Sequence, residues 1–163
     1  MYISKEEYAE IYDPIGDEKI FTRLAYDACR SIDRLTAGAD GIKKLKVAFP
    51  TDKDSAEAVK HCTAHIVHFL YQIQEAEKSA SMGRGYEQTE SGLRSRVIAS
   101  VSAGNESVSY AANQHQQTAA DLAAMDAAQK EKTIREIVKE YLTGVADANG
   151  VNLLYMGPYP VRR

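Results

Sequence analysis

Apolar positions recur every three or four residues through most of this chain, a spacing typical of amphipathic helices. The first such segment starts at Ser4 and reaches about Tyr12, because Ser4 and Glu7 form a capping-box pattern. Pro14 and Gly16 then interrupt the chain. The remaining pattern predicts a helix over about 17–38, a short helix or turn over 39–49, and helices over about 51–79 and 118–143.

The longest apolar stripe lies between residues 51 and 79, directly after Pro50. The stripe is wide, which predicts a central helix contacted from more than one side. Its members are Ala56, Val59, Cys62, Thr63, Ile66, Val67, Phe69, Leu70 and Ile73. The pattern as a whole predicts a mainly α protein, a helical bundle with one long central helix.

Between residues 97 and 110 the apolar period shortens to two, which is typical of strands. Gly104-Asn105 fits a type II′ turn, because glycine takes the positive φ of its first position. We therefore expect a small β-hairpin over about 97–110, preceded by an exposed, mobile loop over 79–92. The register implied by this turn pairs Val101 with Val108, Ala99 with Tyr110, Ser100 with Ser109 and Ser102 with Ser107.

Residues 148–163 combine apolar side chains with Gly157, Pro158 and Pro160, which prevent a helix. We therefore expect one helical domain over 1–147 and an extended C-terminal arm over 148–163. The arm needs a surface to lie on, either its own domain or another subunit or partner. The hairpin and the arm together suggest these interface residues: Val97, Ala99, Val101, Val108, Tyr110, Val151, Leu153, Leu154, Tyr155, Met156 and Tyr159.

Composition adds constraints on partners and location. The 163 residues suffice for one buried core without disulfides or a structural metal. A net charge of −3 and short, separated basic clusters argue against a continuous track for nucleic acid. Cys29 and Cys62 fall in apolar stripes, which favours core thiols in a reducing compartment. No signal-peptide pattern and no membrane-spanning window occurs, so we expect a protein kept in a cytoplasm.

The strongest candidates for metal or catalytic chemistry are His61, His65 and His68, which fall within roughly 60° of one another on a helical wheel. An i, i+4 histidine pair can bind zinc, but no carboxylate shares this stripe. The wheel directs the three side chains away from the apolar stripe. We therefore expect them to face solvent or a second interface, where their protonation would make assembly sensitive to pH. A metal site is the weaker alternative.

Other motifs for chemistry are missing from the sequence. The glycines around Arg84 lack the lysine and hydroxyl residue of a phosphate-binding loop, and no serine occupies a nucleophile elbow. Residues 147–150 lack the ligands of a calcium loop and predict a turn. We therefore expect no catalytic residue, no enzyme activity and no cofactor.

Six segments follow one another along almost the whole chain: YISKEEYAEIY, AYDACRSIDRLT, KLKVAFP, EAVKHCTAHIVHFLYQIQEAE, VIASVSAGNESVSY and IVKEYLTGVADANGVNLLYMGPYP. Their order resembles the small head–tail connector (adaptor) proteins of tailed phages and of prophages in Gram-positive bacteria. The most specific parts of the resemblance are SVSAGNESVSY and NLLYMG.

The resemblance implies a largely helical virion protein without catalytic residues. Such subunits form a homo-oligomeric ring at the virion neck, after assembly in the bacterial host cytoplasm. The ring would dock on the portal protein, extend the DNA channel and meet a downstream neck or tail-completion protein. DNA would pass without sequence-specific binding, and no membrane would be involved.

Two other functions stay open. One is a small helical metal-binding or regulatory protein that uses His61, His65 and His68. The other is a DNA-binding module, which the lack of a basic recognition helix disfavours.

Overall fold

A computed structural model of the chain describes residues 1–82, 84–89, 92–102, 107–110 and 126–160, with only the backbone described over 79–110. The described part is mainly helical, as the apolar periodicity predicts. Within it, no helix is both long and apolar enough to cross a bilayer. The helices are α1 (Lys5–Ala9), α2 (Glu18–Leu35), α3 (Lys44–Val47), α4 (Lys53–Met82) and α6 (Ala127–Leu142).

Local sequence signals set where three helices begin. The Ser4 hydroxyl accepts the Glu7 backbone N–H at 3.2 Å, and the Glu7 carboxylate accepts the Ser4 N–H at 2.8 Å, so the predicted capping box is confirmed. Asp17 caps α2 by accepting two backbone N–H groups of its first turn, and Asp126 caps α6 by accepting the N–H of Ala128. Residues 118–125, assigned by the sequence pattern to the last helix, lie outside the described residues.

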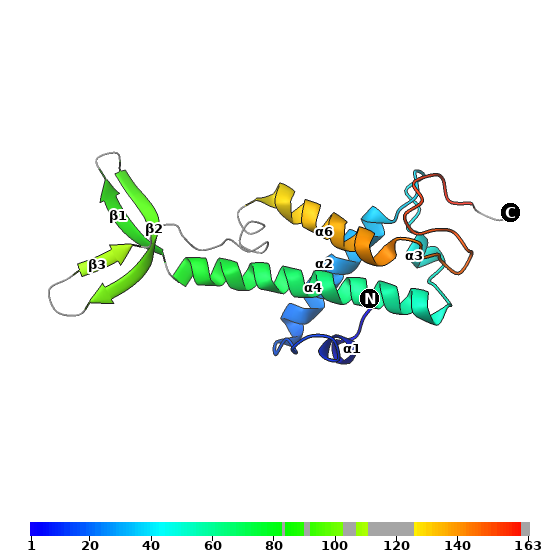
Figure 1. Cartoon of the computed structure of the whole chain (residues 1–163), viewed down its shortest axis with the longest axis horizontal. Helices are drawn as coiled ribbons and strands as arrows, with labels where there is room; N and C mark the ends of the chain where they lie inside the picture. Colours follow the sequence, from blue (N-terminus) through cyan, green and yellow to red (C-terminus); the bar gives the residue numbers. More distant parts are fainter. Residues whose placement is uncertain (83, 90–91, 103–106, 111–125, 161–163) are drawn as a thin grey trace.

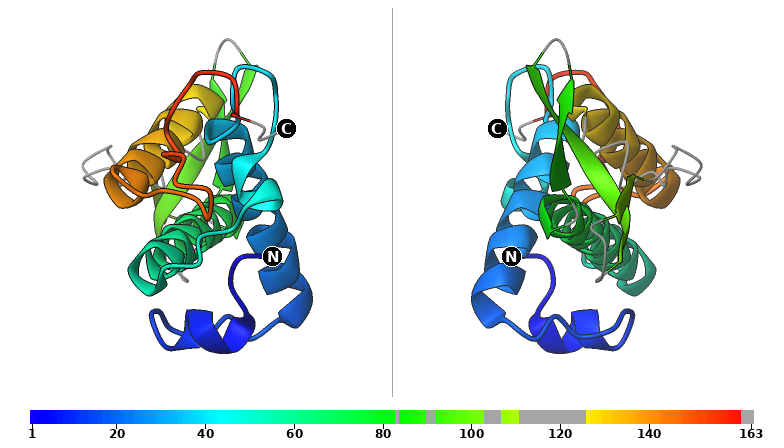
Figure 2. Two further views of the ribbon diagram at one scale, coloured as in Figure 1. Left: turned by 90° about the vertical axis from the view of Figure 1, so that its right-hand side faces the viewer. Right: turned by 90° about the vertical axis from the view of Figure 1, so that its left-hand side faces the viewer.

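The core forms where α2 and α6 pack on α4, while α1 lies on the other side of α4 from α6 (Figures 1 and 2). The apolar stripe predicted for α4 is buried at every position except Ala56, which is half-buried. Cys29 and Cys62 are buried free thiols, as predicted, and burial raises the pKa of Cys62 to about 12. The predicted apolar stripe is therefore the face through which α4 packs on its neighbours.

Three antiparallel strands lie beyond the C-terminal end of α4, in the order β1 (Arg84–Thr89), β2 (Gly92–Ser102) and β3 (Ser107–Tyr110) (Figure 1). Val101 is opposite Val108, and the register then shifts between Ile98 and Ser100. Tyr110 consequently lies opposite Ile98, whereas the sequence pattern paired it with Ala99. Residues 103–106 lie outside the described residues, so the type II′ hairpin turn stays a prediction.

The prediction of a loop over 79–92 is wrong for most of these residues. Residues 79–82 form the last turn of α4, and residues 84–89 form β1. Composition suggested a loop because serine, glycine and polar residues dominate this segment. The β1 backbone instead pairs with β2, and such pairing depends on a partner strand more than on local propensity.

Candidate interaction surfaces

The C-terminal segment, residues 145–160, folds back onto its own helical domain. Leu153 has no exposed surface and Tyr159 is buried. The backbone N–H of Ala39 donates to the carbonyl of Gly157 at 3.2 Å, which joins this segment to the loop after α2. Of the two docking sites left open by the sequence, the structure places the segment on its own domain.

Lys44, at the start of α3, holds this segment from inside the domain. Its side chain is fully buried, and its ammonium group donates to the carbonyl oxygens of Asn152 at 3.1 Å, of Leu153 at 2.9 Å and of Tyr155. An ammonium group has three N–H donors and no acceptor, so these three bonds use its full donor capacity. The Asn152 carbonyl also accepts the Tyr155 backbone N–H at 3.1 Å. Lys44 therefore shares that carbonyl and bonds in addition to those of Leu153 and Tyr155.

The charge of Lys44 is costly to bury, and its surroundings show how the cost is reduced. Burial lowers the pKa of the Lys44 ammonium from its ordinary value, whereas the charges of Asp147 and Asp40 act in the opposite direction. Carbonyl dipoles and two nearby carboxylates thus replace the water around this cation.

Asp147 belongs to the segment and bonds residues within it to one another. One of its carboxylate oxygens accepts the backbone N–H groups of Asn149 and Val151, each at 2.9 Å. The other accepts the hydroxyl of Tyr159 at 2.6 Å. Burial and the bond to Asp147 raise the pKa of Tyr159 above its ordinary value. The turn predicted over 147–150 is confirmed, and its aspartate also fixes a distant tyrosine.

Gly38 allows the segment to approach the α2–α3 loop closely. A Cβ atom at this position would lie 2.6 Å from Oδ1 of Asp40 and 3.1 Å from the Gly157 carbonyl oxygen. The same Asp40 accepts the Tyr159 backbone N–H at 2.9 Å. Any larger residue at position 38 would therefore push the α2–α3 loop away from the C-terminal segment.

The six C-terminal residues expected at an interface separate into two groups. Leu153 and Tyr159 are buried within the domain, and Val151 and Leu154 are half-buried. Tyr155 and Met156 remain 51% and 70% exposed. The extended arm is therefore corrected to a docked segment, because Lys44 and Asp147 satisfy its backbone, and only two of its six candidates are still well exposed.

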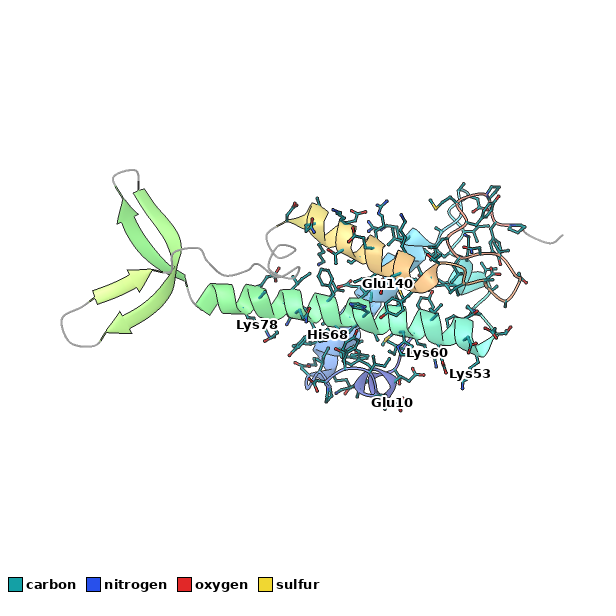
Figure 3. The ribbon with its side chains drawn as sticks, viewed as in Figure 1. Glu10, Lys53, Lys60, His68, Lys78 and Glu140 are labelled. Atoms are coloured by element: carbon teal, nitrogen blue, oxygen red, sulfur yellow. The ribbon has the colours of Figure 1, made fainter. Side chains whose placement is uncertain are left out.

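The predicted histidine stripe does not stay together on one open surface. His61 is exposed, whereas His65 and His68 are half-buried. His68 stacks on Tyr12 with a centroid distance of 4.3 Å, and its Nδ1 lies 3.4 Å from the Tyr8 hydroxyl, so it contacts the α1 region (Figure 3). The wheel placed these side chains away from the main stripe, but Tyr12 packs on His68 there and Tyr141 packs on His65.

His65 performs the corresponding role toward α6. Its Nδ1 lies 3.2 Å from the hydroxyl of Tyr141, and the two rings meet edge to face at 5.6 Å. The second interface that we expected for the histidines thus lies within the chain, where α4 meets Tyr12 and α6. No cluster of three potential metal ligands occurs among the described residues.

One tautomer satisfies both nitrogens of His68. Nδ1–H can donate to the Tyr8 hydroxyl while Nε2 accepts from the Gln72 amide, whose nitrogen is 3.1 Å away. Burial lowers the pKa of His68 from its ordinary value, as does the neighbouring His65, while Asp13 opposes them. The neutral ring is therefore the form that this site favours.

The strand candidates lie in β2 and β3, away from the helical core (Figure 1). Their described backbone positions are Val97 opposite Arg84, Val101 opposite Val108, and Tyr110 opposite Ile98, with Ala99 at the register shift. No contact of these side chains is described, so their interface role stays a prediction.

Sequence reasoning missed Lys44, Asp147 and Asp33 as buried charged residues. Asp33 accepts the hydroxyl of Tyr2 and lies 3.5 Å from the ammonium group of Lys46. The partners of Lys44 lie more than 100 positions away along the chain, so no local pattern identifies them. The turn residue Asp147 was visible in the sequence, but its bond to Tyr159 was not.

Comparisons with protein-family models, with curated proteins and with solved structures give no match to this chain.

Proposed function

We propose that this chain is a structural virion protein that forms a head–tail connector ring. In this role it docks on the portal protein, extends the DNA channel and joins the capsid vertex to the tail. The proposal starts from the order of sequence segments that resembles small phage connectors. The arrangement of the helices and strands supports it.

The observation that carries the proposal is the separation of the strands from the C-terminal segment along α4. This helix has 30 residues, so it is about 45 Å long at the usual rise per residue. The three strands lie beyond its C-terminal end, whereas the docked C-terminal segment lies toward its N-terminal end (Figure 1). A subunit with elements at two distant ends is suited to touch two successive layers of an assembly.

The charge of the chain suits a channel that DNA traverses. A net charge of −3 provides no general attraction for phosphates, and strong attraction would slow DNA that must slide. The alternative of a metal-binding or regulatory protein has less support. His65 and His68 each place a ring nitrogen near a tyrosine hydroxyl, which leaves fewer nitrogens for a metal.

The test mixes the purified chain with the portal protein encoded in the same genome. Negative-stain imaging should show rings of this chain at one end of the portal, and the two proteins should sediment together. A chain that never binds the portal and never appears as a ring would contradict the proposal.

A surface variant then tests the exposed part of the C-terminal segment. The double substitution Tyr155→Ser with Met156→Ser should weaken portal binding while far-UV circular dichroism stays unchanged, since both side chains are exposed. Val47→Ser is the matched control, because Val47 is also an exposed apolar residue, at 60%. Deletion of the segment would be a poorer test, because it would also remove Leu153 from the core.

A further inference from the structure

A cationic hollow lies where the C-terminal half of α2 meets the α2–α3 loop and the start of α6. Its volume is about 570 Å³, and Leu70 and Ile134 contribute apolar surface to its lining. We define the cationic hollow by its four basic side chains, Arg30, Arg34, Lys43 and Lys130. Two carboxylates, those of Asp27 and Asp33, also line it.

The basic side chains of the hollow are only partly neutralised within the chain. Arg34 lies 3.5 Å from the carboxylate of Glu131, with both side chains about half-exposed. Asp33 is already bonded to Tyr2 and lies near Lys46. Across the described residues, Arg30, Lys43 and Lys130 form no ion pair. The hollow therefore keeps a positive surplus that is accessible from outside.

An acidic face occupies another part of the molecule, on α1 and the turn into α2. We define the acidic face by five exposed carboxylates, Glu6, Glu10, Asp13, Asp17 and Glu18. Glu7 does not belong to it, because its carboxylate lies 2.5 Å from the Lys60 ammonium. The α1 helix and the α6 helix lie on different sides of α4 (Figures 1 and 2), and Glu10 projects from the α1 side (Figure 3).

We infer that the acidic face of one copy docks into the cationic hollow of a second copy, with Glu6 and Glu10 facing Arg30 and Lys43. The inference rests on the proposed ring function and assigns the surfaces that join neighbouring subunits. Because the two surfaces are different and lie apart, the contact is head-to-tail, and repeating it produces a closed ring or a filament. Complementary charge would mainly fix the register and speed association.

A second copy suits the hollow better than nucleic acid does. Asp27 and Asp33 interrupt the cations of the hollow, so its positive charge is not continuous. The basic side chains are grouped in one depression and do not form a track along the surface. Glu6 and Glu10 are spaced i, i+4, so an α-helical turn presents both to one compact cationic site.

Charge reversal on each surface tests the inference. The hollow variant carries Arg30→Glu with Lys43→Glu, and the face variant carries Glu6→Lys with Glu10→Lys. Sedimentation velocity over a range of concentrations should show self-association weakened at least tenfold in each. An equal mixture of the two variants should associate within threefold of the native chain, because every contact in an alternating assembly then joins opposite charges.

Matched controls make the same changes of charge elsewhere. Lys53→Glu with Lys139→Glu is the control for the hollow variant, and Glu57→Lys with Glu140→Lys is the control for the face variant. All four control positions are exposed. Self-association of the controls should equal that of the native chain. If a reversed variant fails to fold by circular dichroism, Arg30→Gln with Lys43→Gln provides a neutral version of the same test.

The remaining outcomes overturn the inference in distinguishable ways. Reversed variants that associate like the native chain would overturn this pairing of surfaces, and so would a mixture whose self-association is not restored. Neither result would contradict the proposal that the chain forms a ring on the portal. A native chain that stays monomeric at every concentration overturns copy-to-copy docking, and portal binding by the same sample decides the proposed function separately. Loss of duplex DNA binding in the hollow variant, with association unchanged, would assign the hollow to nucleic acid.

Discussion

Two parts of the molecule that the sequence marked as contact surfaces both pack within the chain, but they do so by different means. The C-terminal segment is held on the domain by the buried ammonium group of Lys44, and the buried carboxylate of Asp147 bonds residues within the segment to one another. The histidine face of α4 is covered by tyrosine rings, with His68 on Tyr12 and His65 on Tyr141. An irregular segment has backbone carbonyls that need hydrogen-bond donors. In the middle of a helix the backbone groups are already paired, so contacts with neighbouring elements are made by side chains.

The largest expected effect comes from Lys44→Met. This substitution keeps a flexible apolar stem but removes donors from three carbonyls, so the unfolding free energy should fall by about 3 kcal/mol. Urea denaturation measures the change. Lys43→Met, at the exposed neighbouring position, should cost little. Equal stability of the two variants would show that the ammonium group does not hold the segment.

Tyr159→Phe should have an intermediate effect. It keeps the buried ring but removes the hydroxyl that donates to Asp147 and accepts from Asn149, so we expect a loss of about 1–2 kcal/mol. Urea denaturation again provides the measurement, with Tyr155→Phe at an exposed tyrosine as the control. If both tyrosines respond alike, the Asp147 attachment contributes no more than a surface hydroxyl.

The smallest effect concerns pH and the histidine side of the comparison. The pKa of His68 is lower in the folded chain than in the unfolded chain, where it is about 6.5. The unfolded state therefore binds the proton more readily. The contribution of His68 to the unfolding free energy should be fully present above about pH 6.5 and should fall as pH decreases through that value. The loss should level off below the lowered folded-state pKa.

Denaturation curves at several pH values would measure this contribution against the variant His68→Gln. The variant should lose the part of the pH dependence that lies below about pH 6.5, while His61→Gln, at an exposed position, should retain it. Identical pH profiles for the native chain and His68→Gln would rule out a contribution from this ring.

The sequence predicted the helical elements better than their contacts. The α4 stripe and the Ser4–Glu7 box depend on neighbours within a few residues, so the local pattern contains the necessary information. The burial of Lys44 depends on carbonyls more than 100 positions away, and the covering of His68 depends on the path of α1. A helical wheel finds the most apolar face of a helix, but it does not count how many neighbours the helix will have.

The attachment of residues 152–159 to Lys44 and Asp40 has a consequence for how the protein is made. Synthesis proceeds from the N-terminus, so α2, α3 and the first turns of α4 are complete long before their last partners leave the ribosome. Until then the Lys44 ammonium group lacks the carbonyls that accept its N–H groups, and the core position of Leu153 is empty. The nascent domain therefore reaches its final packing only once Tyr159 is available, which makes this interval the time at which a chaperone would matter most.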